Sequence, residues 1–204
     1  MEDDVSRLSS LPVSGDSATV WWTRVEGVPA GRVARGLLYR LLGEHLDTDP
    51  RQVELAFGAH GKPRLADEAA ALRFNVSHSG EIAALAFCEG RDVGVDVERV
   101  RGDLSTDAIA RRYLPVQTFR EIERLGAEER PREFFRAWVR LEAYVKGHGG
   151  GLALLDASLE PEGWSIVDLE LLDGYAAALA VEGDLPERVN TSEIRFDSVM
   201  RRTA

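Results

Sequence analysis

Two carboxylates, Asp96 and Glu98, stand two residues apart in the apolar run VGVDVE. Successive side chains of a strand alternate between its faces, so both carboxylates are expected to point the same way, opposite to Val95 and Val97. Paired carboxylates beside apolar residues lose hydration energy unless a cation neutralises them. The pattern therefore predicts a cation site, and hard oxygen donors of this kind suit Mg²⁺.

Hydroxyl and imidazole groups precede the carboxylates, at Ser77, His78 and Ser79 in the stretch FNVSHSG. Such groups donate hydrogen bonds to phosphate oxygens. We expect residues 74–98 to form a loop followed by a two-stranded hairpin, which would place these donors one hairpin away from the carboxylates. Together the two patterns predict a phosphate site bridged by magnesium.

The strongest helical signal lies further along, where apolar residues recur at helical spacing. Its apolar positions are Phe134, Trp138, Leu141 and Val145. The spacing predicts a helix over residues 134–147, with Glu142 and Lys146 one turn apart beside the apolar stripe. Gly147 and the glycines at 149–151 are expected to end this helix.

The remaining segments predict strands and helices in mixed order, which indicates an α+β fold. Strands are expected at residues 18–25, 53–57, 164–171 and 175–181. Helices are expected at residues 32–46, 106–113 and 119–125, with Thr106 as a cap of the second. The tetrapeptide AALA at 83–86 recurs at 177–180, a weak indication of a duplicated unit.

Composition excludes several classes of protein. The 204 residues are 44% hydrophobic and 29% charged, as in ordinary globular proteins, and the formal net charge of −10 argues against nucleic-acid binding. The single cysteine excludes an intramolecular disulfide and fits a reducing cytosol. The chain has no apolar run of membrane length, and its acidic start MEDD does not resemble a signal peptide. We therefore expect a cytoplasmic protein without nucleic-acid or membrane partners.

Four motifs in series give the sequence a family resemblance. They are GKP at 61–63, FNVSHSG at 74–80, GVDVE at 94–98 and WVRLEAYVKG at 138–147. Their order resembles that of the 4′-phosphopantetheinyl transferases of the larger, surfactin-synthetase-associated type, over residues from about 35 to 152. The resemblance implies an α+β pseudo-dimer in one chain, with a loose leader at 1–15, halves at 16–100 and 101–204, and the active site between the halves. It also favours a monomer.

The resemblance implies a reaction and a metal site. Phosphopantetheine would move from coenzyme A to a serine of an apo acyl or peptidyl carrier protein of polyketide, peptide or fatty-acid synthesis, releasing adenosine 3′,5′-bisphosphate. By position, Asp96, Glu98 and Glu142 would be ligands of Mg²⁺, with Mn²⁺ as an alternative. Glu142 would take the serine proton, directly or through water. Lys146 would join Asp96 and Glu142 as a catalytic residue by holding a pyrophosphate oxygen.

The same resemblance implies a site for coenzyme A. Its residues would be Arg35, Lys62, Ser77, His78 and Lys146. Ser77, His78 and Lys62 would hold the 3′-phosphate, and Arg35 would lie near the nucleotide on the first helix.

Two positions depart from the family pattern. Relatives commonly carry Lys where this chain has Leu141, and often Glu where it has Thr118. These changes leave open a catalytically weak coenzyme A or carrier-protein binding protein of the same fold. A metal-dependent phosphohydrolase is a further alternative, although the sequence offers no distinct water-activating cluster. Transfer onto apo carriers would separate these hypotheses.

Overall fold

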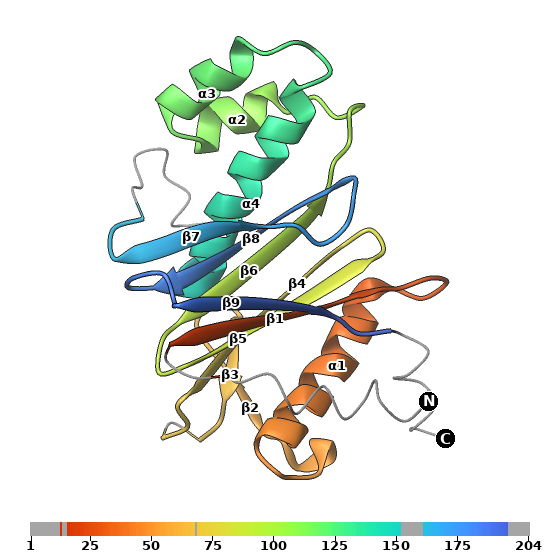
Figure 1. Ribbon diagram of the computed structural model, residues 1–204, viewed down its shortest axis with the longest axis vertical. Coiled ribbons are helices and arrows are strands. Elements are labelled where there is room, and N and C mark those ends of the chain that lie inside the picture. Colours follow the sequence, from red (N-terminus) through yellow and green to blue (C-terminus); the bar gives the residue numbers. More distant parts are fainter. Residues whose placement is uncertain (1–12, 14–15, 68, 152–160, 196–204) are drawn as a thin grey trace.

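The computed structural model describes residues 13, 16–67, 69–151 and 161–195 (Figure 1). The expected leader at 1–15 lies almost entirely outside these residues. The described chain combines helices with three antiparallel or mixed sheets, so the predicted α+β class is confirmed.

Three sheets carry the strands. A four-stranded sheet has the order β4 (Leu72–Ser79), β5 (Ile82–Glu89), β1 (Ser17–Arg24) and β9 (Arg188–Glu193). A three-stranded antiparallel sheet has the order β6 (Val93–Arg99), β8 (Tyr175–Glu182) and β7 (Trp164–Leu169). A small hairpin pairs β2 (Leu55–Phe57) with β3 (Pro63–Leu65). Only the β1–β9 pair is parallel among the pairs of described strands.

The helices lie outside the two larger sheets. The long ones are α1 (Ala30–His45) and α4 (Arg130–His148), and the short ones are α2 (Asp107–Tyr113), α3 (Val116–Glu123) and the 3₁₀ helix η1 (Pro50–Gln52). In Figure 1, α2 and α3 cluster at the upper end of α4, whereas β2 and β3 lie at the opposite end of the molecule. None of the helices in the described part of the chain is long and apolar enough to cross a membrane.

Three buried clusters define four layers in the order helix, sheet, sheet, helix. One cluster packs α1 against the four-stranded sheet, through residues such as Leu37 and Phe74. A second lies between the two larger sheets, where β5 and β1 face the valines of β6. The third packs α4 against the alanines of β8, with Val139 and Ala178 fully buried. Val139 lies outside the predicted apolar stripe of this helix. Within the stripe, Trp138 is only partly buried and packs against Tyr113 of α2.

The expectation of a loop followed by a two-stranded hairpin over residues 74–98 is wrong, because residues 74–79, expected in the loop, belong to strand β4. The hairpin forms between β4 and β5, and β6, the expected partner of β5, pairs with β8 instead. The physical reason is that β5 already has a partner on each edge, β4 on one side and β1 on the other. Although β6 falls within the predicted first half, 16–100, it belongs to the three-stranded sheet. Conversely, β9 from the predicted second half joins the first sheet.

The two AALA segments occupy equivalent places. They lie in β5 and β8, each of which has a strand partner on both sides within its sheet. All eight residues are buried. Small side chains at these positions let the layers on both faces approach closely.

Two expected helix ends differ from the structure. Gly147 does not end α4, which continues to His148 and is capped by Gly149 in the left-handed conformation (φ 76°). Thr106 precedes α2 in a helical conformation, and its side chain makes no capping hydrogen bond. Gly147 is retained inside the helix because it makes a close contact with β6.

Candidate active site

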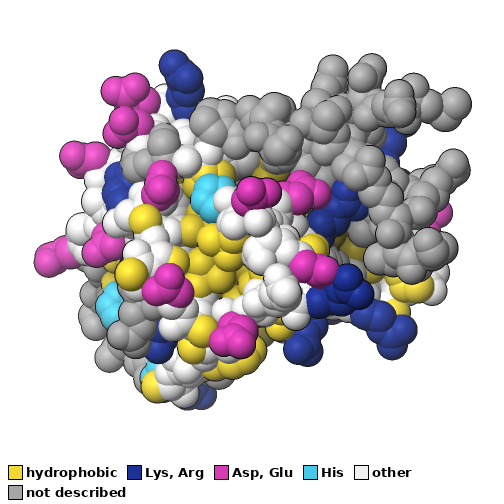
Figure 2. All heavy atoms as spheres, turned by 90° about the horizontal axis from the view of Figure 1, so that it is seen from below, with side chains coloured by type: hydrophobic (Ala, Val, Ile, Leu, Met, Phe, Trp, Pro, Cys, Tyr) yellow, Lys and Arg dark blue, Asp and Glu magenta, His cyan; other side chains and the backbone are white. Residues whose placement is uncertain are grey.

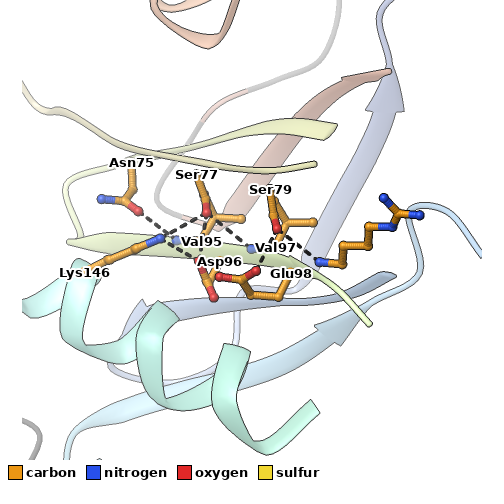
Figure 3. Close-up of polar contacts among 9 residues, drawn as sticks. Asn75, Ser77, Ser79, Val95, Asp96, Val97, Glu98 and Lys146 are labelled. Carbon is orange, nitrogen blue, oxygen red and sulfur yellow. Dashed lines mark hydrogen bonds and ion pairs between the residues drawn. The ribbon is translucent and has the colours of Figure 1, made fainter. Parts of the chain in front are cut away.

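A row of polar side chains on β4 covers the free edge of β6, and we call it the polar seam (Figure 3). It consists of three alternate residues, whose side-chain oxygens accept hydrogen bonds from backbone N–H groups of β6. The pairs are Val95 N to Asn75 Oδ1 (3.0 Å), Val97 N to Ser77 Oγ (3.3 Å) and Arg99 N to Ser79 Oγ (3.1 Å). The seam thus replaces a backbone ladder and joins the two larger sheets.

Asp96 of β6 is a deeply buried carboxylate beside the polar seam, with 2% of its surface exposed. Its Oδ1 accepts a hydrogen bond from Ser77 Oγ (2.8 Å) and lies 2.5 Å from Lys146 Nζ, which reaches it from α4. Lys146 also donates to Ser77 Oγ (3.0 Å). The other oxygen, Asp96 Oδ2, is buried without a hydrogen-bond partner. An orphaned carboxylate oxygen of this kind is an acceptor for a cation or a donor that the chain itself does not supply.

Glu98 and Glu142 extend the negative charge beyond Asp96. Ser79 Oγ donates a 2.6 Å hydrogen bond to Glu98 Oε2. Burial, together with the nearby charges of Asp96 and Glu98, raises the pKa of Glu142, and Lys146 only partly opposes this. Three carboxylates therefore face one ammonium group, and the site carries excess negative charge.

Two glycines bring α4 close enough for this arrangement. A Cβ atom at Gly94 would overlap the Ala143 carbonyl oxygen and the Gly147 amide nitrogen, and would lie 2.7 Å from the Gly147 Cα. A Cβ atom at Gly147 would lie 2.6 Å from the ring of Trp164. The backbones of β6 and α4 thus touch directly, which places Lys146 beside Asp96.

Lys62 lies at the carboxyl end of α4. Its ammonium group donates to the Gly147 carbonyl oxygen and pairs with Asp92 (3.1 Å). A cation at this position favourably meets the negative end of the helix dipole. Burial lowers the pKa of Lys62, while Asp92 opposes the shift. A cavity of about 360 Å³ opens beside Lys62 and also receives Arg64 and Arg73.

His78 points to the opposite face of β4 from Ser77, because neighbouring residues of a strand alternate. Its imidazole lies against Gly31 in the first turn of α1, where a Cβ atom would come within 2.7 Å of Nε2. Arg35 lies one turn further along the same helix and is exposed, as is His78. The imidazole of His78 and the side chain of Arg35 therefore both lie at the amino-terminal part of α1, where the helix dipole favours anions.

The structure therefore divides the predicted site residues into three groups. Asp96, Glu98, Glu142, Lys146 and Ser77 come together at the polar seam. Lys62 lies at the end of α4, and His78 lies with Arg35 at α1. Ser77, expected with His78 to hold a phosphate, is instead buried and hydrogen-bonded to Asp96, so these two side chains do not converge.

Sequence reasoning missed the roles of Asn75 and Gly94. Asn75, Ser77 and Ser79 recur every second residue, and this period of two could have shown that they share one face of a strand. Nothing local, however, identifies β6 as the strand that this face covers.

The donors fit a divalent cation by their chemistry. Oxygen ligands from carboxylates suit Mg²⁺, and Asp96 Oδ2 lacks any other partner. Among the described residues, no three acidic, histidine or cysteine side chains are close enough to form a complete cage in the arrangement seen. Lys146 lies on Asp96 and supplies the positive charge there.

The two positions that depart from the family pattern share one small cavity. Thr118 and Leu141 both line a space of about 160 Å³ between the start of α3, α4 and β7. Leu141 is partly buried and packs against the buried cluster that lies between α4 and β8. These side chains are therefore part of an apolar contact rather than of the polar seam.

The charge of the surface is uneven. Seen from below the view of Figure 1, apolar side chains occupy the middle of the face and acidic ones are scattered around them, whereas Lys and Arg gather on one side (Figure 2). Although the net charge of the chain is −10, this face therefore has a basic region that can attract an anion.

The crowding of carboxylates predicts a pH-dependent effect on stability. The folded-state pKa of Glu142 lies above its unfolded value, so wild-type stability falls as pH rises through that interval. Glu142→Gln removes this penalty. In EDTA, we expect the variant to melt roughly 1–3 °C higher than wild type at neutral pH, a small gain because the side chain is partly exposed. At about pH 3, below the ordinary pKa of a glutamate, Glu142 is protonated in both states and the two proteins should melt together. Thermal melts across this range check the prediction, and a lower melting temperature of the variant at neutral pH would contradict it.

Comparison with known proteins gives the same family for both parts of the chain. A family model described as "4′-phosphopantetheinyl transferase superfamily" matches residues 92–185. A second, "4′-phosphopantetheinyl transferase, N-terminal", matches residues 17–90. The two matches meet just before β6.

Individual relatives agree. The chain is 34% identical to the 4′-phosphopantetheinyl transferase HetI of Nostoc sp. over 163 residues, which cover 73% of this chain and 69% of HetI. It is 29% identical to the 4′-phosphopantetheinyl transferase AcpT of Salmonella typhimurium, over 72% of this chain and 64% of AcpT. It is 32% identical to a phosphopantetheinyl transferase of Thraustochytrium sp., over 69% of this chain and 54% of that protein. The chain belongs to the 4′-phosphopantetheinyl transferase superfamily.

Proposed function

We propose that this protein is an active, Mg²⁺-dependent phosphopantetheinyl transferase that uses coenzyme A and an apo carrier protein. One observation carries the proposal: Asp96, Glu98, Glu142 and Lys146 lie together at the polar seam, and a buried oxygen of Asp96 has no partner. In a chain of this family, the arrangement fits the neutralisation of a pyrophosphate and its metal.

In the proposed reaction, the hydroxyl oxygen of a carrier serine forms a bond to the β-phosphorus of coenzyme A. The bond from that phosphorus to the bridging oxygen breaks, and adenosine 3′,5′-bisphosphate leaves with this oxygen. Asp96, Glu98 and Glu142 would hold Mg²⁺, which when bound spreads the charge that develops on the phosphates.

Glu142 is our candidate for the general base. Its carboxylate lies close enough to Asp96, Glu98 and Lys146 to feel their charges, and it would take the serine proton, directly or through water, as the new bond forms. Lys146 would donate a hydrogen bond to a pyrophosphate oxygen from its place beside Asp96 and Ser77. Its ammonium group has three donor hydrogens, so it can contact a phosphate without leaving Asp96.

The proposal is tested by mass spectrometry of several apo carrier proteins after incubation with coenzyme A and Mg²⁺. We expect each accepted carrier to gain one phosphopantetheine, and EDTA to abolish the gain. Binding of coenzyme A or carrier without any gain would support the catalytically weak alternative. Loss of coenzyme A without any carrier would support a phosphohydrolase.

The nucleotide end of the substrate gives a separate prediction. His78 lies at the positive end of α1 near Arg35, so we expect it to contact the 3′-phosphate. His78→Ala should raise KM for coenzyme A roughly tenfold or more, the value of a charge-assisted hydrogen bond. It should have little effect on KM for dephospho-coenzyme A, which lacks that phosphate. Steady-state kinetics with both substrates check this.

Two other variants serve as comparisons. His45→Ala changes an exposed histidine at the other end of α1 and should leave both KM values unchanged. Lys62→Ala should also affect coenzyme A more than dephospho-coenzyme A, but it should lower the melting temperature as well, because Lys62 holds the end of α4. Equal effects of His78→Ala on the two substrates would show that His78 does not recognise the 3′-phosphate.

A further inference from the structure

The three residues of the polar seam all accept a hydrogen bond from a backbone N–H group of β6, but they differ in their other contacts. Ser77 and Ser79 each use the hydroxyl proton to donate to a carboxylate of β6, at Asp96 and Glu98. Asn75 contacts neither carboxylate, since its recorded bond is the one from Val95 N to its Oδ1. The hydroxyl group can accept and donate at once, whereas an amide oxygen can only accept. The two serines therefore combine a structural bond with a bond to a carboxylate.

The two carboxylates are not held equally. Asp96 is buried and is fixed by Ser77 together with Lys146. Glu98 is only partly buried, and its longer side chain has an additional rotatable bond. The hydrogen bond that the structure records on Glu98 comes from Ser79, at 2.6 Å. The direction of the Glu98 carboxylate thus depends on this one hydroxyl more than that of Asp96 depends on Ser77.

We propose that Ser79 is a positioning residue, which orients the Glu98 carboxylate so that its second oxygen faces the cation site. The inference rests on the proposed function, because Glu98 is a metal ligand only in that function. Outer partners that fix a ligating carboxylate commonly strengthen metal binding. Ser79 itself touches neither metal nor substrate in this assignment.

The geometry allows this role to be separated from the role of Ser79 in the fold. Ser79→Ala frees the N–H of Arg99, but Arg99 is exposed and water can replace the hydroxyl. Asn75→Ala frees the N–H of Val95, which is fully buried and has no such replacement. Loss of a buried hydrogen-bond partner is the costlier change for stability. Asn75→Ala should therefore have the larger effect on stability, and Ser79→Ala should have the larger effect on metal binding.

The test measures Mn²⁺ binding to the whole protein by electron paramagnetic resonance, and the Mg²⁺ concentration that half-activates transfer. For Ser79→Ala we expect the dissociation constant for Mn²⁺ and the half-activating Mg²⁺ concentration each to rise about tenfold. The rate at saturating Mg²⁺ and the melting temperature should remain close to those of wild type. Ser79→Thr keeps the hydroxyl and should restore Mn²⁺ affinity. Asn75→Ala should melt lower than Ser79→Ala yet bind Mn²⁺ like wild type.

Unchanged Mn²⁺ affinity in Ser79→Ala would overturn the inference while leaving the proposed function intact, provided that wild type transfers phosphopantetheine. Equal losses of affinity in Ser79→Ala and Asn75→Ala would also overturn it, because the effect would then come from loosening of the two sheets. Wild-type protein that neither binds Mn²⁺ nor transfers would overturn the inference together with the proposed function.

Discussion

Asp96→Asn is expected to lower the rate of phosphopantetheine transfer by at least about 100-fold, the loss typical when a preorganised charge is removed from a reacting centre. Asparagine keeps the shape of the side chain but removes the negative charge that Lys146 and the proposed metal share. The fold should survive, because Lys146 is partly exposed and can turn to water. Transfer rates at limiting and saturating Mg²⁺, with circular dichroism as a check of folding, measure the effect.

A matched control for this change is Asp168→Asn. Asp168 on β7 also pairs with cations of α4, at Arg136 (2.8 Å) and Arg140 (2.6 Å), but it lies outside the polar seam. We expect this variant to keep its transfer activity. Near wild-type activity of Asp96→Asn at limiting Mg²⁺ would contradict the assignment of Asp96 as a metal ligand.

Gly94→Ala is expected to have the largest effect on stability. The added methyl group would overlap backbone atoms of Ala143 and Gly147, and backbone cannot turn aside as a flexible side chain can. Forcing atoms into a packed contact costs about 3 kcal/mol. For a chain of this size, that lowers the melting temperature by roughly 6–12 °C. Activity should fall as well, even below the melting temperature, because α4 carries Glu142 and Lys146 and must move away from β6.

Gly36→Ala is the control for Gly94→Ala. Gly36 lies on the exposed side of α1, and a Cβ atom there would meet nothing within 4 Å. Alanine favours the helix over glycine by up to about 1 kcal/mol, so this variant should be slightly more stable than wild type. A Gly94→Ala protein that melts within about 2 °C of wild type would refute the backbone contact between β6 and α4.

The division of the chain into halves can be redrawn from these observations. We propose that it falls just before β6 rather than after residue 100. The two family matches meet between residues 90 and 92, and β6 pairs with β8. In this division, the polar seam joins the halves, since its side chains come from β4 and accept hydrogen bonds from backbone N–H groups of β6. The expectation of an active site between the halves fits this placement and remains a prediction.

Local patterns in the sequence predicted the long helices, several of the strands and the direction of the paired carboxylates, but they missed β9 and assigned most of β4 to a loop. The period of two in VGVDVE placed Asp96 and Glu98 on one face of a strand, and the helical period placed Glu142 and Lys146 one turn apart. These features depend on residues that are close in the chain, so local patterns are sufficient. The order of four motifs also indicated the family, which the comparisons confirmed.

Which segments meet could be seen only in the folded chain. The sequence predicted that β6 would pair with β5 in a hairpin. In the structure both edges of β5 are occupied by other strands, and β6 pairs with β8, far along the chain. That choice turned Ser77 and Ser79 from expected phosphate donors into partners of β6. It also kept Gly147 within α4, because the contact with Gly94 requires a residue without a side chain. Such contacts join residues about 20 to 90 positions apart, and their free energy depends on the packing of both partners, which a local pattern does not contain.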